Sequence, residues 1–162
     1  MPLVAAFLVP GQPLHFLRPA EPPYSALVAG HAAAAQALAA ARPEVLIVYS
    51  TQWIAVLDEL WQLRPHVQGL HVDENWYEYG DLPFDLRIDT DLTAACIAAT
   101  PAIGVRSKGV DYDGFPIDTG TIVATGFLDP AGSCPLVLAA NNVYHDWSRT
   151  AELGALVAAQ AE

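Results

Sequence analysis

Two short runs of apolar residues constrain the fold most strongly. Val45–Tyr49 is rich in β-branched residues, and Leu136–Ala140 is entirely apolar. Strands with this composition are suited to burial on both faces, which occurs where helices cover both sides of a parallel sheet. The two runs therefore predict strands at the centre of an α/β domain.

Predicted strands and helices alternate along the chain. The predicted strands are Leu3–Val9, Val45–Tyr49, Gly69–Asp73, a short strand or irregular stretch within Gly104–Gly114, and Leu136–Ala140. The predicted helices are Tyr24–Ala41, Ile54–Leu63, Asp91–Thr100 after start signals at Asp89 and Thr90, Thr119–Leu128, and Arg149–Ala161 after a cap at Asp146 or Ser148. The other long stretches, Gln12–Pro23 and Asn75–Pro83, are predicted loops. Such alternation predicts one layered α/β domain over residues 1–162, with a largely parallel sheet flanked by helices.

The composition is strongly apolar and acidic. Hydrophobic residues make up 53% of the chain and charged residues 15%, which argues against a disordered protein. The 18 acidic residues outnumber the 7 basic ones, so the formal net charge is −11. Such a surface repels phosphate groups, and neither nucleic acid nor an anionic membrane is an expected partner. The surplus of apolar residues leaves some for an interface, so a homo- or hetero-oligomer is expected.

No segment of the sequence is predicted to cross or enter a membrane. The uncharged stretch Ala26–Ala41 is shorter than the roughly 20 residues that a spanning helix needs. Met1–Val9 is apolar but has no basic residue and runs into Pro10, so we expect a strand rather than a signal peptide. Cys96 and Cys134 form no CxxC motif and no metal-ligand spacing, and we expect both to be reduced. These features together favour a cytoplasmic protein.

Ligands of open α/β sheets bind beyond the carboxyl ends of the strands. The loops expected there are Pro10–Leu14, Ser50–Trp53 and Asn141–Asp146. The sequence contains no glycine-rich phosphate loop, no GxSxG elbow and no HExxH motif. The polar side chains of these loops are therefore candidates for some other chemistry.

His71 and Asp73 form the clearest polar pair outside these loops. Residues two apart on a strand point to the same face, so the pair can share a cation or form a purely structural contact. His145 follows an apolar strand directly, together with Asn141 and Asn142. Polar residues in that place either line a site or hold a loop in position. His71, Asp73 and His145 are therefore weak catalytic candidates, and both interpretations stay open.

Four segments together resemble the LigB-like class III extradiol dioxygenases, enzymes that open aromatic rings. The segments are Phe7–Pro13, Val45–Trp53, Ile117–Thr121 and Pro135–Gly154. Their order and spacing carry the likeness along nearly the whole chain. The resemblance is strongest to the non-catalytic alpha subunit of the aminophenol ring-cleaving enzymes. It implies a shortened LigB-like fold and a role in the catabolism of aromatic compounds.

The resemblance also implies that this chain lacks the iron ligands of the family. Catalytic members bind Fe(II) through two histidines and a glutamate. The place of the first histidine reads Gly11-Gln12-Pro13, Gln52 stands at the place of the second, and an Asp-His-Gly motif reads Asp118-Thr119-Gly120. Glycine offers no ligand, and a neutral amide binds Fe(II) far less well than imidazole does. We therefore expect no metal and no other cofactor in this chain.

The function expected from the resemblance is that of a non-catalytic companion subunit, which docks on a catalytic LigB-like chain. The former ligand positions would line a pocket formed by Gly11, Gln12, Gln52, Thr119, Asn141 and Asn142. Two alternatives are a stand-alone oxidoreductase with a relocated metal and a module that binds a small aromatic ligand. Either would use a polar pocket around His71, Asp73 and His145.

Overall fold

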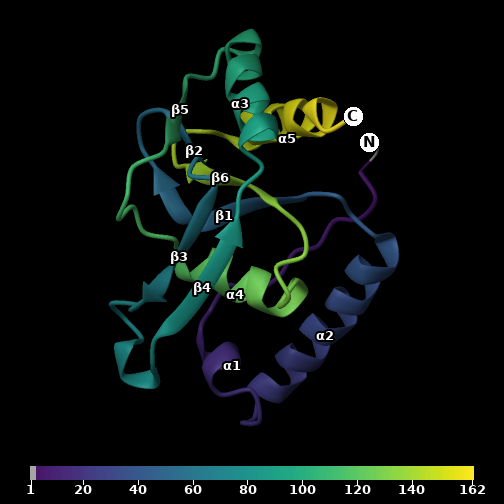
Figure 1. The fold of residues 1–162 in the computed structure, drawn as a ribbon, viewed down its shortest axis with the longest axis vertical. Coiled ribbons are helices and arrows are strands. Elements are labelled where there is room, and N and C mark those ends of the chain that lie inside the picture. The colour runs from purple at the N-terminus through teal and green to yellow at the C-terminus, as the bar shows by residue number, and fades with distance from the viewer. Residues whose placement is uncertain (1–2) are drawn as a thin grey trace.

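The computed structural model describes residues 3–162 (Figure 1). The helices are α1 (Leu14–Leu17), α2 (Tyr24–Ala41), α3 (Thr90–Ala99), α4 (Thr119–Leu128) and α5 (Trp147–Gln160), with short 3₁₀ turns η1 (Tyr77–Tyr79) and η2 (Thr100–Ile103). The strands are β1 (Leu46–Ala55), β2 (Glu59–Gln62), β3 (His66–His71), β4 (Leu82–Arg87), β5 (Ser107–Val110) and β6 (Leu136–Asn142).

Four strands form the main sheet in the order β1-β6-β2-β5. β1 runs parallel to β6, and β2 runs parallel to β5, whereas β2 meets β6 in antiparallel fashion where Trp61 faces Ala139. β3 and β4 form a separate antiparallel pair. The predicted α/β domain with a mostly parallel sheet flanked by helices is thereby confirmed.

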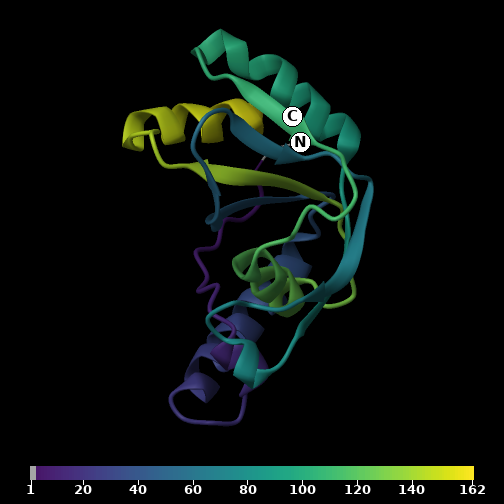
Figure 2. The same cartoon turned by 90° about the vertical axis from the view of Figure 1, so that its left-hand side faces the viewer.

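β6 lies at the centre of the core, as its apolar sequence predicts. Leu136, Leu138 and Ala140 face a cluster that includes Ile122 of α4, whereas Val137 and Ala139 face a second cluster. The second cluster contains Cys96 of α3 and Leu153 and Val157 of α5. Figure 2 shows the same layering, with α3 and α5 on one side of the sheet and α2 and α4 on the other. Burial on both faces explains why this strand lacks the alternation of a half-exposed one.

Three of the helices begin at an aspartate that accepts a backbone hydrogen bond. Asp89 accepts from Leu92 N at 2.9 Å, Asp118 from Thr121 N at 2.9 Å and Asp146 from Arg149 N at 2.8 Å. A side-chain oxygen in this position satisfies an N–H group that has no partner within the helix. The predicted caps at Asp89 and Asp146 are confirmed, and the helices Tyr24–Ala41 and Thr119–Leu128 have the predicted bounds.

The predicted strand Leu3–Val9 is wrong. Residues 3–9 have no regular structure, and Leu3, Val4, Phe7 and Leu8 are exposed. This segment and β1 line a common cavity. The cavity separates the two segments, so their backbones do not pair as neighbouring strands of a sheet do. Met1 and Pro2 lie outside the described residues.

The predicted helix Ile54–Leu63 is also wrong. β1 continues to Ala55, and β2 follows at Glu59–Gln62. Trp61 is fully buried there between β6 and β5, and such long-range pairing overrides local helix propensity. Smaller differences concern the predicted loops, because Gln12–Pro23 contains α1 and Asn75–Pro83 runs into β4. The strand predicted at Gly69–Asp73 overlaps β3, which begins earlier, at His66, and ends at His71. Asp73 therefore lies beyond the strand, and the expectation that it shares a strand face with His71 is wrong.

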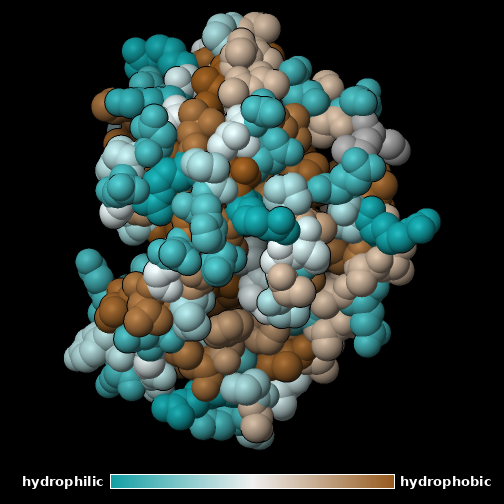
Figure 3. All heavy atoms as spheres, in the orientation of Figure 1, coloured by the Kyte–Doolittle hydropathy of each residue, from teal (hydrophilic) through white to brown (hydrophobic). Residues whose placement is uncertain are grey.

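The surface of the described residues carries both hydrophobic and hydrophilic side chains. Figure 3 shows hydrophobic residues scattered among hydrophilic ones over the face seen in Figure 1. Within residues 3–162 no helix is both long and apolar enough to span a membrane.

Candidate functional site

A polar network joins Ser50, midway along β1, to the start of α4. Ser50 Oγ donates to Asp118 Oδ1 at 2.6 Å, and the Thr121 hydroxyl donates to Asp118 Oδ2 at 2.6 Å. Because Asp118 also caps α4, one carboxylate connects a buried strand to a helix N-terminus, where a negative charge is stabilised. The network therefore holds the first turn of α4 against the sheet.

Three of the former ligand positions meet beside this network. The Gln52 amide donates to the carbonyl oxygen of Gly11 at 3.0 Å. A Cβ atom on Gly11 would lie 2.6 Å from Gly120 Cα and 3.1 Å from Gln52 Nε2, so only glycine fits there. Gln12 lies next to Gly11, and its side chain is exposed. The structure thus brings Gly11, Gln52 and the turn at Thr119 and Gly120 together.

Thr119 links the predicted pair His71 and Asp73. His71 Nε2 lies 2.9 Å from Thr119 Oγ1, and the Thr119 hydroxyl donates to Asp73 Oδ2. Since a hydroxyl has a single proton, Thr119 accepts from the Nε2–H of His71. His71 Nε2 and Asp73 Oδ2 are 4.0 Å apart. The strand β3 and the loop after it therefore meet the start of α4 at a partly buried polar contact.

His145 belongs to a different cluster, around a residue that sequence reasoning missed. His145 Nδ1 lies 3.6 Å from Oε2 of Glu59, whose side chain is fully buried. Burial raises the pKa of Glu59 to about 7, because the charged form loses its hydration. Burial and then the charge of Arg149 lower the pKa of His145, while Asp146 opposes this shift. Both groups are therefore driven towards their neutral forms near pH 7.

The two asparagines after β6 hold neighbouring segments in place. The Tyr49 hydroxyl donates to Asn141 Oδ1 at 2.8 Å. Burial, and then the charge of Glu59, raise the pKa of Tyr49. Asn142 Nδ2 donates to the carbonyl oxygen of Leu57 at 3.3 Å, and Asn142 Oδ1 accepts from Tyr144 N at 3.0 Å. None of these contacts reaches His71 or Asp73, so the structure separates the candidates into two clusters.

Comparisons with known proteins identify the family. Residues 14–162 match the family model for the catalytic LigB subunit of aromatic ring-opening dioxygenases. The chain belongs to the LigB family. It is 48% identical over 160 residues to the 2-aminophenol 1,6-dioxygenase alpha subunit of a Pseudomonas species, a match that covers 98% of this chain and 59% of that relative. It is 28% identical over 114 residues to the 2-aminophenol 1,6-dioxygenase beta subunit, also from Pseudomonas, covering 70% of this chain and 37% of the relative.

These matches confirm the resemblance seen in the sequence. They also show that this LigB-family chain spans about 59% of the length of the alpha subunit and 37% of the length of the beta subunit.

Among residues 3–162, Gly11, Gln52 and Thr119 do not fit the iron that the LigB family implies. Within residues 3–162 no group of three or more histidine, cysteine, aspartate and glutamate side chains is arranged to hold a metal ion. The Gln52 amide is engaged by the Gly11 carbonyl, and the Thr119 hydroxyl is engaged by His71 and Asp73. A facial Fe(II) site needs imidazole and carboxylate ligands that converge, and these positions supply neither.

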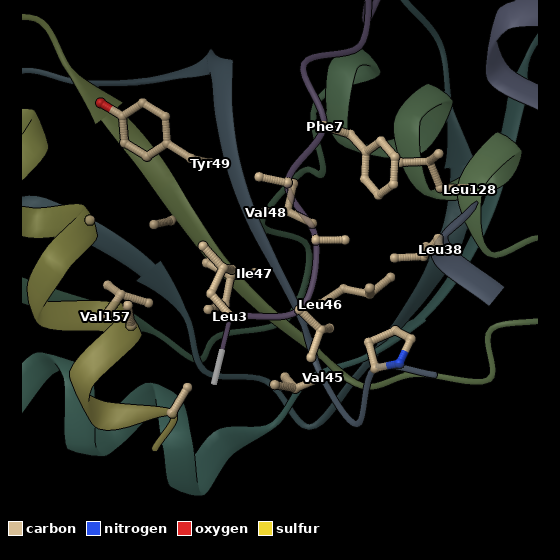
Figure 4. Close-up of a pocket in the computed structure, with 18 of the residues that line it drawn as sticks. Leu3, Phe7, Leu38, Val45, Leu46, Ile47, Val48, Tyr49, Leu128 and Val157 are labelled. Atoms are coloured by element: carbon tan, nitrogen blue, oxygen red, sulfur yellow. The ribbon is translucent and has the colours of Figure 1, made fainter. Parts of the chain in front are cut away.

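A cavity lies against β1, away from His71, Asp73 and Asp118, and Tyr49 lies between it and the cluster around Glu59. It measures about 580 Å³ and is bounded by the N-terminal segment, β1, α5 and the ends of α2 and α4. Figure 4 shows Val157 of α5 on one side, Leu38 and Leu128 on the other, and Ile47 of β1 between them. The walls are mainly apolar, with the Tyr49 hydroxyl near one end. Sequence reasoning missed this cavity because it placed ligands only beyond the strand ends.

Proposed function

We propose that this chain is a non-catalytic companion subunit, which assembles with a catalytic LigB-family chain that opens aromatic rings. The observation that carries the proposal is 48% identity along 98% of the chain to an alpha subunit whose enzyme also has a beta subunit. A weaker match to that beta subunit supports descent of both kinds of subunit from one fold. We further propose that residues 1–162 form one domain and that the protein acts in the cytoplasm.

The chemistry of the former ligand positions supports a non-catalytic role. Glycine stands at position 11, and the Gln52 amide bonds to its backbone. Nearby, the Asp118 carboxylate accepts hydrogen bonds from the Ser50 hydroxyl and from the hydroxyl and backbone N–H of Thr121 in the first turn of α4. The places of the two histidine ligands thus hold a glycine and an amide that fix the backbone, instead of groups that would bind a cation. In the assembled enzyme this chain would stabilise and shape the complex, and it would not supply side chains that react with the substrate.

Co-expression tests the proposal directly. The chain would be produced with the beta subunit of the Pseudomonas 2-aminophenol 1,6-dioxygenase and purified through a tag on one partner. We expect a stable complex in a fixed ratio and a higher activity towards 2-aminophenol than the beta subunit shows alone. The absence of both association and any change in activity would refute the proposal.

A second candidate function is the binding of a small aromatic molecule. The cavity of Figure 4 favours it, because about 580 Å³ lies within the range of roughly 300–1,000 Å³ typical of ligand pockets, and its walls are mainly apolar. A thermal-shift screen with catechol and 2-aminophenol tests this function. Ligand at 100 times its dissociation constant stabilises the folded state by about 2.7 kcal/mol, and an unchanged melting temperature would count against it.

A further inference from the structure

Six large apolar side chains are exposed where β1 leads into β2 and where β6 leads into α5. We call this set the loop-tip surface. Its members, with their exposed fractions, are Ile54 (57%), Val56 (54%), Leu57 (80%), Val143 (50%), Tyr144 (80%) and Trp147 (87%). Ile54 lies near the end of β1, and Val56 and Leu57 lie between β1 and β2. Val143 and Tyr144 lie between β6 and α5, and Trp147 is the first residue of α5. Single exposed apolar residues are ordinary, but a group of this size indicates an interaction site.

Hydrogen bonds hold the two loops side by side. Val143 N donates to the carbonyl oxygen of Ala55 at 3.0 Å. Asn142 Nδ2 donates to the carbonyl oxygen of Leu57, and its Oδ1 accepts from Tyr144 N, so one buried side chain binds both loops. The exposed side chains therefore project from a fixed backbone. A surface ordered in advance loses less conformational entropy on binding.

The exposed area is that of a large apolar patch. An aromatic side chain buries about 150–250 Å² when fully covered, so Tyr144 and Trp147 alone offer on the order of 300 Å². The four aliphatic side chains add to this area. The total therefore exceeds the lower end of the roughly 300–600 Å² found for the largest apolar patch on a typical monomer. Tryptophan and tyrosine are also the residues enriched at binding hot spots.

Charge and position decide which partner fits. Each copy of the chain carries a formal net charge of −11, so two copies repel each other. Acidic Asp58 and Asp146 flank the surface in sequence, and Arg106 lies 3.2 Å from Asp58, so charges of both signs border the surface. Ile54 lies four residues beyond Ser50, which bonds to Asp118 in the former ligand region. A chain seated here would lie next to that region.

We propose that the loop-tip surface is the face on which the catalytic LigB-family subunit docks. This inference rests on the companion-subunit function proposed above and names the residues that perform it. Leu57, Tyr144 and Trp147 are the anchors, because they are the most exposed of the set. Asn142 is a positioning residue, since it acts by holding both loops.

A pair of matched double variants tests the assignment. Leu57→Ala with Trp147→Ala removes two anchors, and Leu70→Ala with Tyr77→Ala removes two side chains of similar exposure (67% and 66%) elsewhere. Binding to the beta subunit of the Pseudomonas enzyme would be measured by surface plasmon resonance, with the beta subunit immobilised. We expect the first variant to bind about 30-fold more weakly or worse, as for loss of a hot spot, and the second to bind as the wild type does. Circular dichroism and melting temperature would verify that both variants fold.

The possible outcomes separate this inference from the proposed function. If the wild type binds and both double variants bind equally well, the docking face is elsewhere and the companion-subunit function stands. If the wild type does not bind at all, the proposed function fails and this inference falls with it. If the chain alone forms a dimer that only the Leu57 and Trp147 variant disrupts, the surface belongs to a second copy, and the inference is also overturned.

Discussion

Replacing Glu59 with glutamine should change how the stability of this chain depends on pH. Glu59 is fully buried, and burial raises its pKa from the ordinary value of 4.5 to about 7. Below pH 4.5 the carboxyl group is protonated in both the folded and the unfolded chain, so it contributes no pH dependence there. Between pH 4.5 and 7 the unfolded chain loses the proton first, and the free energy of unfolding falls as the pH rises.

The size of the effect follows from the two pKa values. One pKa unit corresponds to about 1.36 kcal/mol, so the wild type should lose about 2.5 kcal/mol of stability from Glu59 between pH 5 and pH 8. Glutamine remains neutral throughout, and any fixed difference in its hydrogen bonding is the same at both pH values. The variant keeps His145, Tyr49 and Arg149, whose own contributions largely cancel in the comparison.

The assay is urea denaturation of both proteins from pH 5 to pH 8, followed by tryptophan fluorescence. The stability of Glu59→Gln relative to the wild type should rise by about 2.5 kcal/mol across this range. A relative stability that stays constant with pH would show that Glu59 ionises as an exposed glutamate does, and would refute the argument from burial.

Three other perturbations have defined outcomes. Gly11→Ala should destabilise the chain by about 1–3 kcal/mol in urea denaturation, because the new Cβ would lie 2.6 Å from Gly120 Cα, and an unchanged midpoint would contradict this contact. Asp118→Ala should lose about 1–2 kcal/mol through the α4 cap and the bond from Ser50, whereas Asp118→Asn should lose less; equal losses would argue against the cap. Added Fe(II) under anaerobic conditions should leave the melting temperature unchanged, and a clear rise that His71→Ala abolishes would reveal a metal site.

The sequence predicted the elements whose signals are local. The apolar run of β6 and the aspartates that cap α3 and α5 act within a few residues of themselves, and the structure has them where the sequence placed them. The helix predicted over Ile54–Leu63 failed because β2 is fixed by distant strands. Periodicity within a window cannot register a pairing such as that of Trp61 with Ala139.

The same distinction holds for the candidate site. His71 and Asp73 were found because they are near in sequence, although Thr119, which joins them, comes from another element. Glu59 was missed because its burial depends on the insertion of β2 beside β6. The only sequence signal was an acidic residue next to Leu60 and Trp61, and that pattern also fits the exposed face of a helix. Likewise, the cavity beside β1 depends on the path of residues 3–9, which local propensity placed in a strand.

Oxygen-dependent ring opening by the purified chain is the decisive measurement. It would be assayed by 2-aminophenol consumption with Fe(II) present, for the chain alone, for the Pseudomonas beta subunit alone and for the two together. If the chain is a companion subunit, it should show no turnover alone, and the mixture should turn over 2-aminophenol faster than the beta subunit does alone. Sustained turnover by this chain alone, with iron bound in a single protomer, would contradict the account.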